Sequence, residues 1–188
     1  MPKLLIVFFI FFSILPLKAF GISPNECFTL ADFESDVRKS SWRTVNDNVM
    51  GGQSRGGSVL DNGTLVFSGA TNTNGGGFSS VLTRLNPQSL VGYNHVLLRA
   101  KSDGREFRLI FPDNRRDRVV HRAKIPFDQD KNWQNVSVSF EELVPTIFGE
   151  PVNADRFEPG YTNSIGLIIN DGQDGSFKLQ VDWIKICK

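Results

Sequence analysis

The stretch SFKLQVDWIKIC spans residues 176–187 and alternates apolar with polar side chains. The apolar positions run from Phe177 to Trp183, after which Ile184 begins the opposite parity. Alternation with a period of two is typical of a β-strand that buries one face. We therefore expect a strand here, with a β-bulge near residues 182–184 that returns all of these apolar side chains to one core.

Similar strand patterns, bounded by Gly, Asn or Asp, recur along the chain. Examples are RVVHRAKIPF at 118–127, QNVSVSF at 134–140 and NSIGLIIND at 163–171. The 188 residues also include 17 Gly and 9 Pro, which favour frequent turns over helices. Many short strands joined by turns predict a single all-β domain at residues 22–188, built as an antiparallel sandwich or barrel.

One hairpin has a predictable register. In HVLLRAKSDGREFRLIF, residues 95–111, Asp103 and Gly104 form a favoured two-residue turn. Pairing the strands outward from this turn makes one face wholly apolar and places Arg99 opposite Arg108. Because like charges in that position repel, we expect either a neighbouring carboxylate or an anionic or polyhydroxylated ligand beside them.

The first 21 residues, MPKLLIVFFIFFSILPLKAFG, have the features of a secretory signal peptide. One lysine precedes an apolar run at 4–15, and small residues follow near a cleavage position at Gly21. We expect cleavage there and an exported protein, either periplasmic or secreted. The run is too short to span a bilayer comfortably, so no stable membrane anchor should remain.

Cleavage would leave a nearly neutral domain. Loss of Lys3 and Lys18 takes the formal net charge from +1 to −1. Such a domain has no general attraction to nucleic acid or to anionic membranes. Two sequons, NGT at Asn62 and NVS at Asn135, would matter in an organism that glycosylates exported proteins.

The chain has two cysteines, Cys27 and Cys187, near the two ends of the expected domain. In an oxidising compartment two such thiols usually pair. We therefore predict a disulfide that closes almost the whole domain. The chain-entropy account assigns a loop of that length roughly 4–5 kcal/mol of stabilisation.

Two polar, glycine-rich segments are the candidate binding loops: VNDNVMGGQSRGG at 45–57 and TNTNGGGFSS at 71–80. Asn, Asp and Gly tolerate positive φ and cap their own backbone, so each segment could simply be a well-ordered turn. Held at one end of a sandwich, the two loops could instead present amides to a sugar, a cation or a peptide. The candidate binding residues are Trp42, Asn46, Asp47, Asn48, Met50, Gly51, Gly52, Asn74, Gly75 and Gly76, together with Arg99 and Arg108.

The sequence offers little for catalysis. No Cys/His cluster has metal-ligand spacing, and no nucleophile elbow or phosphate-binding loop occurs. Glu141 and Glu142 are adjacent and would point apart in an extended chain. His121 shares an apolar strand face, so we expect a core or rim histidine with a satisfied hydrogen bond. We therefore expect no enzyme activity, no cofactor and no metal.

Several motifs occur in an order that closely resembles the complex I intermediate-associated protein 30 family. They are WRTVNDNVMGGQS, NGGGFSSV, LLRAKSDGREFRL, FEELVPTIFG, SIGLII and LQVDWI, and they cover about residues 33–186. The resemblance implies a galactose-binding-like β-sandwich of jelly-roll type. It also implies a non-catalytic role like that of the mitochondrial members, which look like assembly factors for respiratory complex I.

The leader and the terminal cysteines depart from those mitochondrial members. Complex I is built on the matrix or cytoplasmic side of its membrane, which an exported protein does not reach. We therefore expect an exported, non-catalytic module with an assembly or chaperone role, whose partner is a protein or an assembly intermediate. The alternative is a secreted carbohydrate-binding module, with Trp42 and Trp133 as aromatics for sugar stacking, although we expect both to be mainly buried.

Overall fold

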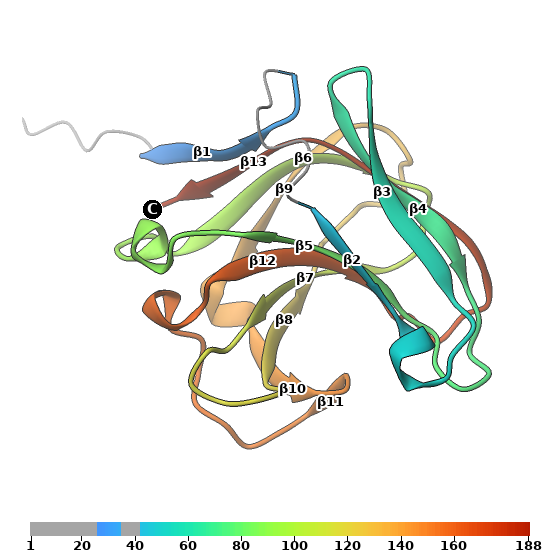
Figure 1. The fold of residues 1–188 in the computed structure, drawn as a ribbon. Coiled ribbons are helices and arrows are strands. Elements are labelled where there is room, and N and C mark those ends of the chain that lie inside the picture. The colour runs from blue at the N-terminus through green and yellow to red at the C-terminus, as the bar shows by residue number, and fades with distance from the viewer. Residues whose placement is uncertain (1–25, 35–41) are drawn as a thin grey trace, which may run out of the picture.

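The computed structural model describes residues 26–34 and 42–188, and two antiparallel sheets pack face to face in it (Figure 1). The signal peptide expected at residues 1–21 lies outside the described residues. The all-β antiparallel sandwich predicted from the strand patterns is confirmed. None of the helices in the described ranges has the length and apolar character needed to cross a membrane.

The first sheet contains the long last strand at its centre. Its order is β3 (Arg55–Asp61), β4 (Thr64–Thr71), β13 (Gly175–Cys187), β6 (His95–Ser102) and β9 (Gln134–Ser139), and β1 (Cys27–Asp32) pairs with the end of β13. The second sheet has the order β11 (Glu150–Pro151), β10 (Val144–Ile147), β8 (Val120–Lys124), β7 (Phe107–Pro112), β12 (Ser164–Ile169), β5 (Ser79–Arg84) and β2 (Arg43–Asn46).

Four short 3₁₀ helices complete the fold: η1 (Asp47–Met50), η2 (Pro87–Leu90), η3 (Phe140–Glu142) and η4 (Pro159–Tyr161). The first of them, η1, follows β2 at the end of the sandwich where β13 begins. In Figure 1 this helix lies on the opposite side of the molecule from the C-terminus. We call this side the loop end, and the side with the C-terminus the disulfide end.

The bulge expected in the last strand is present. The register of β13 against β6 shifts between Val181 and Trp183. Val181 and Ile184 are both buried, so the bulge does return the apolar series to one core. The prediction is wrong for Trp183, because the extra residue is Asp182 and the indole therefore turns to the outer face. There the ammonium of Lys185 lies 4.4 Å from its ring centroid.

The predicted hairpin between β6 and β7 does not form. The two strands belong to different sheets, where β6 pairs with β13 and β9 and β7 pairs with β12 and β8. Asp103 explains the crossing: its N–H donates to the carbonyl of Lys178 (3.1 Å), and its carboxylate accepts from the N–H of Lys178 (2.6 Å). These bonds hold the turn to β13 while the chain passes to the opposite sheet.

The apolar faces of the two sheets meet in a core rich in phenyl rings. Phe67, Phe107 and Phe177 contact one another with ring centroids 5.0–6.2 Å apart. All three are buried, and burial of each such side chain contributes roughly 1.5–3 kcal/mol. His121 is buried as predicted, with Nε2 2.9 Å from the carbonyl oxygen of Asp155.

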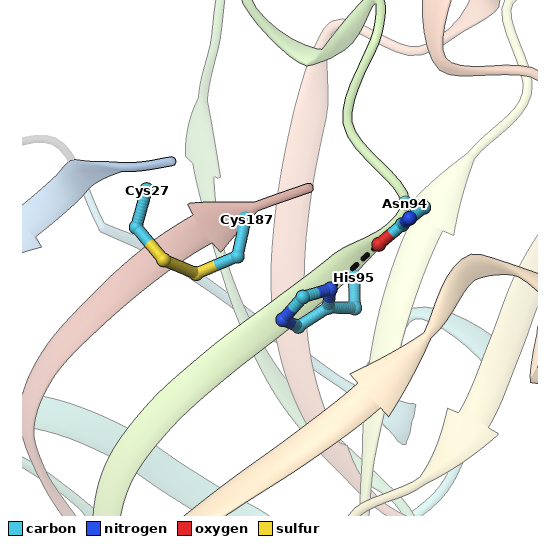
Figure 2. Close-up of a disulfide and its surroundings, with 4 residues drawn as sticks. All are labelled: Cys27, Asn94, His95 and Cys187. Carbon is cyan, nitrogen blue, oxygen red and sulfur yellow. Dashed lines mark hydrogen bonds between the residues drawn. A yellow bond between two sulfur atoms is a disulfide. The ribbon is translucent and has the colours of Figure 1, made fainter. Parts of the chain in front are cut away.

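The predicted disulfide is confirmed. Cys27 on β1 and Cys187 on β13 are bonded, and they also pair directly in the strand register (Figure 2). The bond joins positions 160 residues apart, so it ties the first described strand to the last one.

Candidate functional site

The carboxylate of Asp47 joins the two glycine-rich loops. Its Oδ1 accepts the N–H of Ser54 (2.9 Å), and its Oδ2 accepts the hydroxyl of Ser54 (2.5 Å). Across the gap between the loops, Oδ2 also accepts the N–H of Gly77 (2.6 Å) and of Phe78 (3.2 Å). The side chain of Asp47 is fully buried, so one carboxylate fixes the spacing of both loops.

Two glycines make this close packing possible. A Cβ built on Gly52 would lie 2.3 Å from Cγ of Asp47, and one built on Gly76 would lie 2.4 Å from its Oδ2. Both distances are too short for a real side chain, so any residue with a Cβ would displace the carboxylate. The glycine repeats therefore have a packing role around Asp47, in addition to the turn role that the sequence suggested.

The environment keeps Asp47 ionised. Burial acts to raise the pKa of its carboxyl, but the Ser54 hydroxyl and the amides of Gly77, Phe78 and Ser54 outweigh burial and lower the pKa below its ordinary value. Because these donors occupy its lone pairs, Asp47 is poorly placed to act as a general base or to bind a cation. Within the described ranges, no group of three or more His, Cys, Asp or Glu residues could hold a metal ion.

The outer surface of the two loops is polar and exposed. It includes five of the predicted residues, which we call the loop tip: Asn48, Gly51, Asn74, Gly75 and Gly76. The two loops meet there, since a Cβ built on Gly75 would lie 3.5 Å from the carbonyl oxygen of Gly51. The N–H of Asn74 donates to Oδ1 of Asn72 (2.9 Å), which gives this loop the Asx turn expected from its composition.

Other predicted residues near the loops point inward. Asn46 donates from Nδ2 to the carbonyl of Gly56 (3.1 Å), and this bond ties β2 to β3 across the two sheets. Trp42 is half-buried and packs beside Phe33, with ring centroids 6.0 Å apart. The side chain of Met50 lies outside the described part of the structure.

The two arginines do not form a shared site. Arg99 lies on the outer face of the first sheet, where its Nε is 3.0 Å from Oδ2 of Asp182. Arg108 lies on the outer face of the second sheet and pairs with Glu106. The predicted opposition of Arg99 and Arg108 is wrong because β6 and β7 lie in different sheets. Each arginine does have the carboxylate that the repulsion argument anticipated.

Two features of the structure were not predicted from the sequence. Ser54 donates two hydrogen bonds to Asp47, although nothing in the pattern GGQSRGG predicts a role for this serine. A cavity of about 530 Å³ at the disulfide end includes His95 and Glu141. Pairing of β6 with β9 brings these distant positions together, and the sequence does not specify that pairing.

One aromatic side chain is more exposed than expected. Trp133, which we expected to be mainly buried, is 38% exposed and lies before β9. The guanidinium of Arg99 lies 5.8 Å from the centroid of its ring. The outer face of the first sheet therefore presents the indole of Trp133, in addition to the less exposed indole of Trp183.

Comparison with solved structures supports the fold. The family 11 carbohydrate-binding module from Clostridium thermocellum, in complex with a β-1,3-1,4-mixed-linked tetrasaccharide, has a TM-score of 0.60 at 16% identity, over 85% of this chain and 94% of the module. The agarase AgWH50C has a TM-score of 0.59 at 13% identity, over 85% of this chain and 24% of the enzyme. At these identities the likeness concerns the jelly-roll sandwich.

Sequence comparison identifies the family. The probable mitochondrial complex I intermediate-associated protein 30 of Caenorhabditis briggsae is 25% identical over 104 residues, which are 50% of this chain and 29% of that protein. This chain thus covers less than a third of that relative. The family described as Complex I intermediate-associated protein 30 (CIA30) matches residues 31–181. The chain therefore belongs to the complex I intermediate-associated protein 30 family.

Proposed function

We propose that this protein is an exported, non-catalytic binding module that holds a protein partner or an assembly intermediate through the loop tip. The family and the carbohydrate-binding fold of its structural neighbours both support a non-catalytic module. The observation that carries the proposal is the buried Asp47 carboxylate that joins two separate loops. A surface fixed in advance loses little conformational entropy when a partner binds.

The proposed compartment rests on the leader and the disulfide. A disulfide between the ends of the domain suits an oxidising compartment, as export would provide. The name of the C. briggsae relative places that protein in mitochondria. For this chain we propose a scaffold or chaperone role toward a different, exported partner.

The test is recovery of a partner from the native compartment with loop-tip variants. The double variant Asn48→Ala/Asn74→Ala removes two exposed amides from the loop tip and leaves Asp47 in place. Asn153→Ala, at an exposed asparagine away from the loop tip, is the matched control. We expect the control to recover a defined protein as the wild type does. The double variant should recover at least about tenfold less of that protein, which is the effect of roughly one lost hydrogen bond. Equal recovery by both variants would remove the loop tip from the proposal.

A second candidate function is carbohydrate binding. The observation that favours it is the exposed ring of Trp133, because sugar rings stack on accessible aromatic faces. The family 11 module, which has this fold, was solved with a bound tetrasaccharide. A glycan array probed with the wild-type protein and with Trp133→Ala tests this function. Signal above background supports carbohydrate binding, loss of that signal in Trp133→Ala places the binding at this ring, and an array without signal removes this function.

A further inference from the structure

The cavity at the disulfide end lies at the opposite end of the sandwich from the loop tip. Its volume is about 530 Å³, within the range of roughly 300–1,000 Å³ that is usual for small-molecule sites. Segments from three parts of the chain line it: the approach to β6, the outer face of β9 with η3, and η4. Figure 2 shows His95 at this end, close to the disulfide.

The walls of the cavity are held by main-chain bonds. The N–H of Asn94 donates to the carbonyl of Cys187 (3.0 Å), and the N–H of Phe140 donates to the carbonyl of Asn94 (2.8 Å). A capping box closes η3, in which Glu142 accepts the N–H of Ser139 (2.7 Å). The disulfide fixes the end of β13 beside these residues. The cavity is thus preformed.

Several polar groups in the cavity have spare hydrogen-bonding capacity. Nδ1 of His95 lies 2.6 Å from Oδ1 of Asn94 (Figure 2). With the proton on Nδ1, this bond leaves the Nε2 lone pair of His95 as an acceptor. Among residues 26–34 and 42–188, the Ser137 hydroxyl and the Glu141 carboxylate have no side-chain partner, and both are exposed. Acceptors and donors therefore stand together at one rim.

The cavity also has apolar surface. Tyr93 contributes a half-buried aromatic ring and Pro159 contributes a flat aliphatic ring, whereas the ring of Phe140 packs into the core and is only 8% exposed. The described lining contains no Arg or Lys to favour an anion, and its one carboxylate is too little for a cation site. A neutral ring with one apolar face and a rim of hydroxyl groups matches this combination.

We propose that this cavity is a binding site for a neutral pyranose sugar. Its aromatic and prolyl wall contacts the C–H face of the sugar, and Glu141, His95 and Ser137 bond its hydroxyl groups. The site rests on the second candidate function, carbohydrate binding, and names where that binding occurs. It is separate from the loop tip proposed for protein binding.

The experiment is a titration of the isotope-labelled full-length protein with simple sugars, followed by two-dimensional NMR. The protein is purified from the host that produces it, in the form in which that host processes it. The probes are methyl β-D-glucopyranoside, methyl β-D-galactopyranoside and methyl α-D-mannopyranoside, each up to about 50 mM, which detects even millimolar affinity. Sorbitol, a polyol without a ring, is the negative probe. We expect at least one glycoside to give saturable shifts at the amides of Tyr93, His95 and Phe140, and sorbitol to give none there.

Variants then locate the site. Glu141→Gln and Ser137→Ala change exposed side chains and should leave the fold intact, and Glu150→Gln on β11 is the matched control. We expect each cavity variant to weaken binding roughly tenfold and the control to bind as the wild type does. If sugar binds with shifts around Trp133, and Trp133→Ala removes them, carbohydrate binding stands and this site is wrong. If no glycoside binds, the site and the second candidate function fail together, while the loop-tip proposal is unaffected.

Discussion

The α-carbon of Gly76 lies so close to Asp47 that a methyl group on it would fall 2.4 Å from the carboxylate oxygen Oδ2. These residues belong to different loops, 29 positions apart in the sequence. Their contact holds the two glycine-rich loops together as one surface. The stability of the loop end should therefore depend on both partners of this contact.

Removing the carboxylate should be costly. Asp47→Ala leaves the amides of Ser54, Gly77 and Phe78 without their acceptor, and we expect it to lower the free energy of unfolding by about 2–4 kcal/mol. Denaturant unfolding measures this. Asp128→Ala, at an exposed aspartate, is the control and should change stability by no more than about 0.5 kcal/mol. Similar values for the two variants would contradict the structural role of Asp47.

A single methyl group should also disrupt the loop end. Gly76→Ala and Gly52→Ala would each force a Cβ into Asp47, and we expect a loss of about 1–3 kcal/mol from overpacking. Gly160→Ala is the matched control, because its Cβ would meet nothing closer than 4.0 Å. Thermal unfolding of the three variants distinguishes them, and an unchanged midpoint for Gly76→Ala would show that the loops are further apart than described.

The charge on Asp47 predicts a pH dependence. Hydrogen bonds lower the pKa of this carboxyl in the folded protein, while an unfolded aspartate titrates near about 3.9. A group whose pKa is lower in the folded state stabilises the protein above its unfolded pKa and loses that contribution as pH falls through the folded value. The stability difference between wild type and Asp47→Asn should therefore be constant above about pH 5 and shrink below about pH 4. Denaturant unfolding between pH 3 and about pH 7 measures this difference. A difference that grows on acidification would mean that folding raises the pKa of Asp47, which would contradict the prediction.

The disulfide should stabilise the fold strongly. It closes a loop of 160 residues, for which chain entropy gives about 4–5 kcal/mol. We expect the variant Cys27→Ser/Cys187→Ser to lose stability of this order, and reductant to have no further effect on it. The comparison is denaturant unfolding with and without reductant. Wild-type protein that is indifferent to reductant would contradict the prediction.

Arg99 and Arg108 should act independently. They lie on the outer faces of opposite sheets, so a double-mutant cycle with Arg99→Ala and Arg108→Ala should give a coupling energy below about 0.5 kcal/mol. A hairpin that placed them side by side would give a larger, repulsive coupling. The cycle therefore tests the assignment of β6 and β7 to different sheets.

Much of the fold follows from local patterns. Val136, Val138 and His121 are buried on the faces that their parity predicts, because side-chain alternation is a property of the strand itself. The bulge in β13 was also visible, since a change of parity within one strand requires an extra residue. The disulfide followed from two cysteines and the expectation of an oxidising compartment.

The sequence was less informative about which strands pair with one another. The turn at Asp103 and Gly104 has the composition of a hairpin, yet the bonds from Asp103 to Lys178 direct it across the sandwich. Parity tells which face is buried but not which strand lies alongside. The burial of Asp47 was hidden for a similar reason, because it depends on a contact with a loop about 30 residues away. The amino-acid composition identified both loops as candidate sites, but it could not distinguish the buried residue that supports them, Asp47, from the exposed residues around it.

Site-specific photo-crosslinking in the native cell tests the central claim most directly. A photoreactive amino acid at position 74 samples the loop tip, and the same group at position 153 samples an exposed surface elsewhere. We predict one defined protein adduct from position 74 and none from position 153. Identical adducts from both positions, or none from position 74, would contradict a binding surface organised by Asp47.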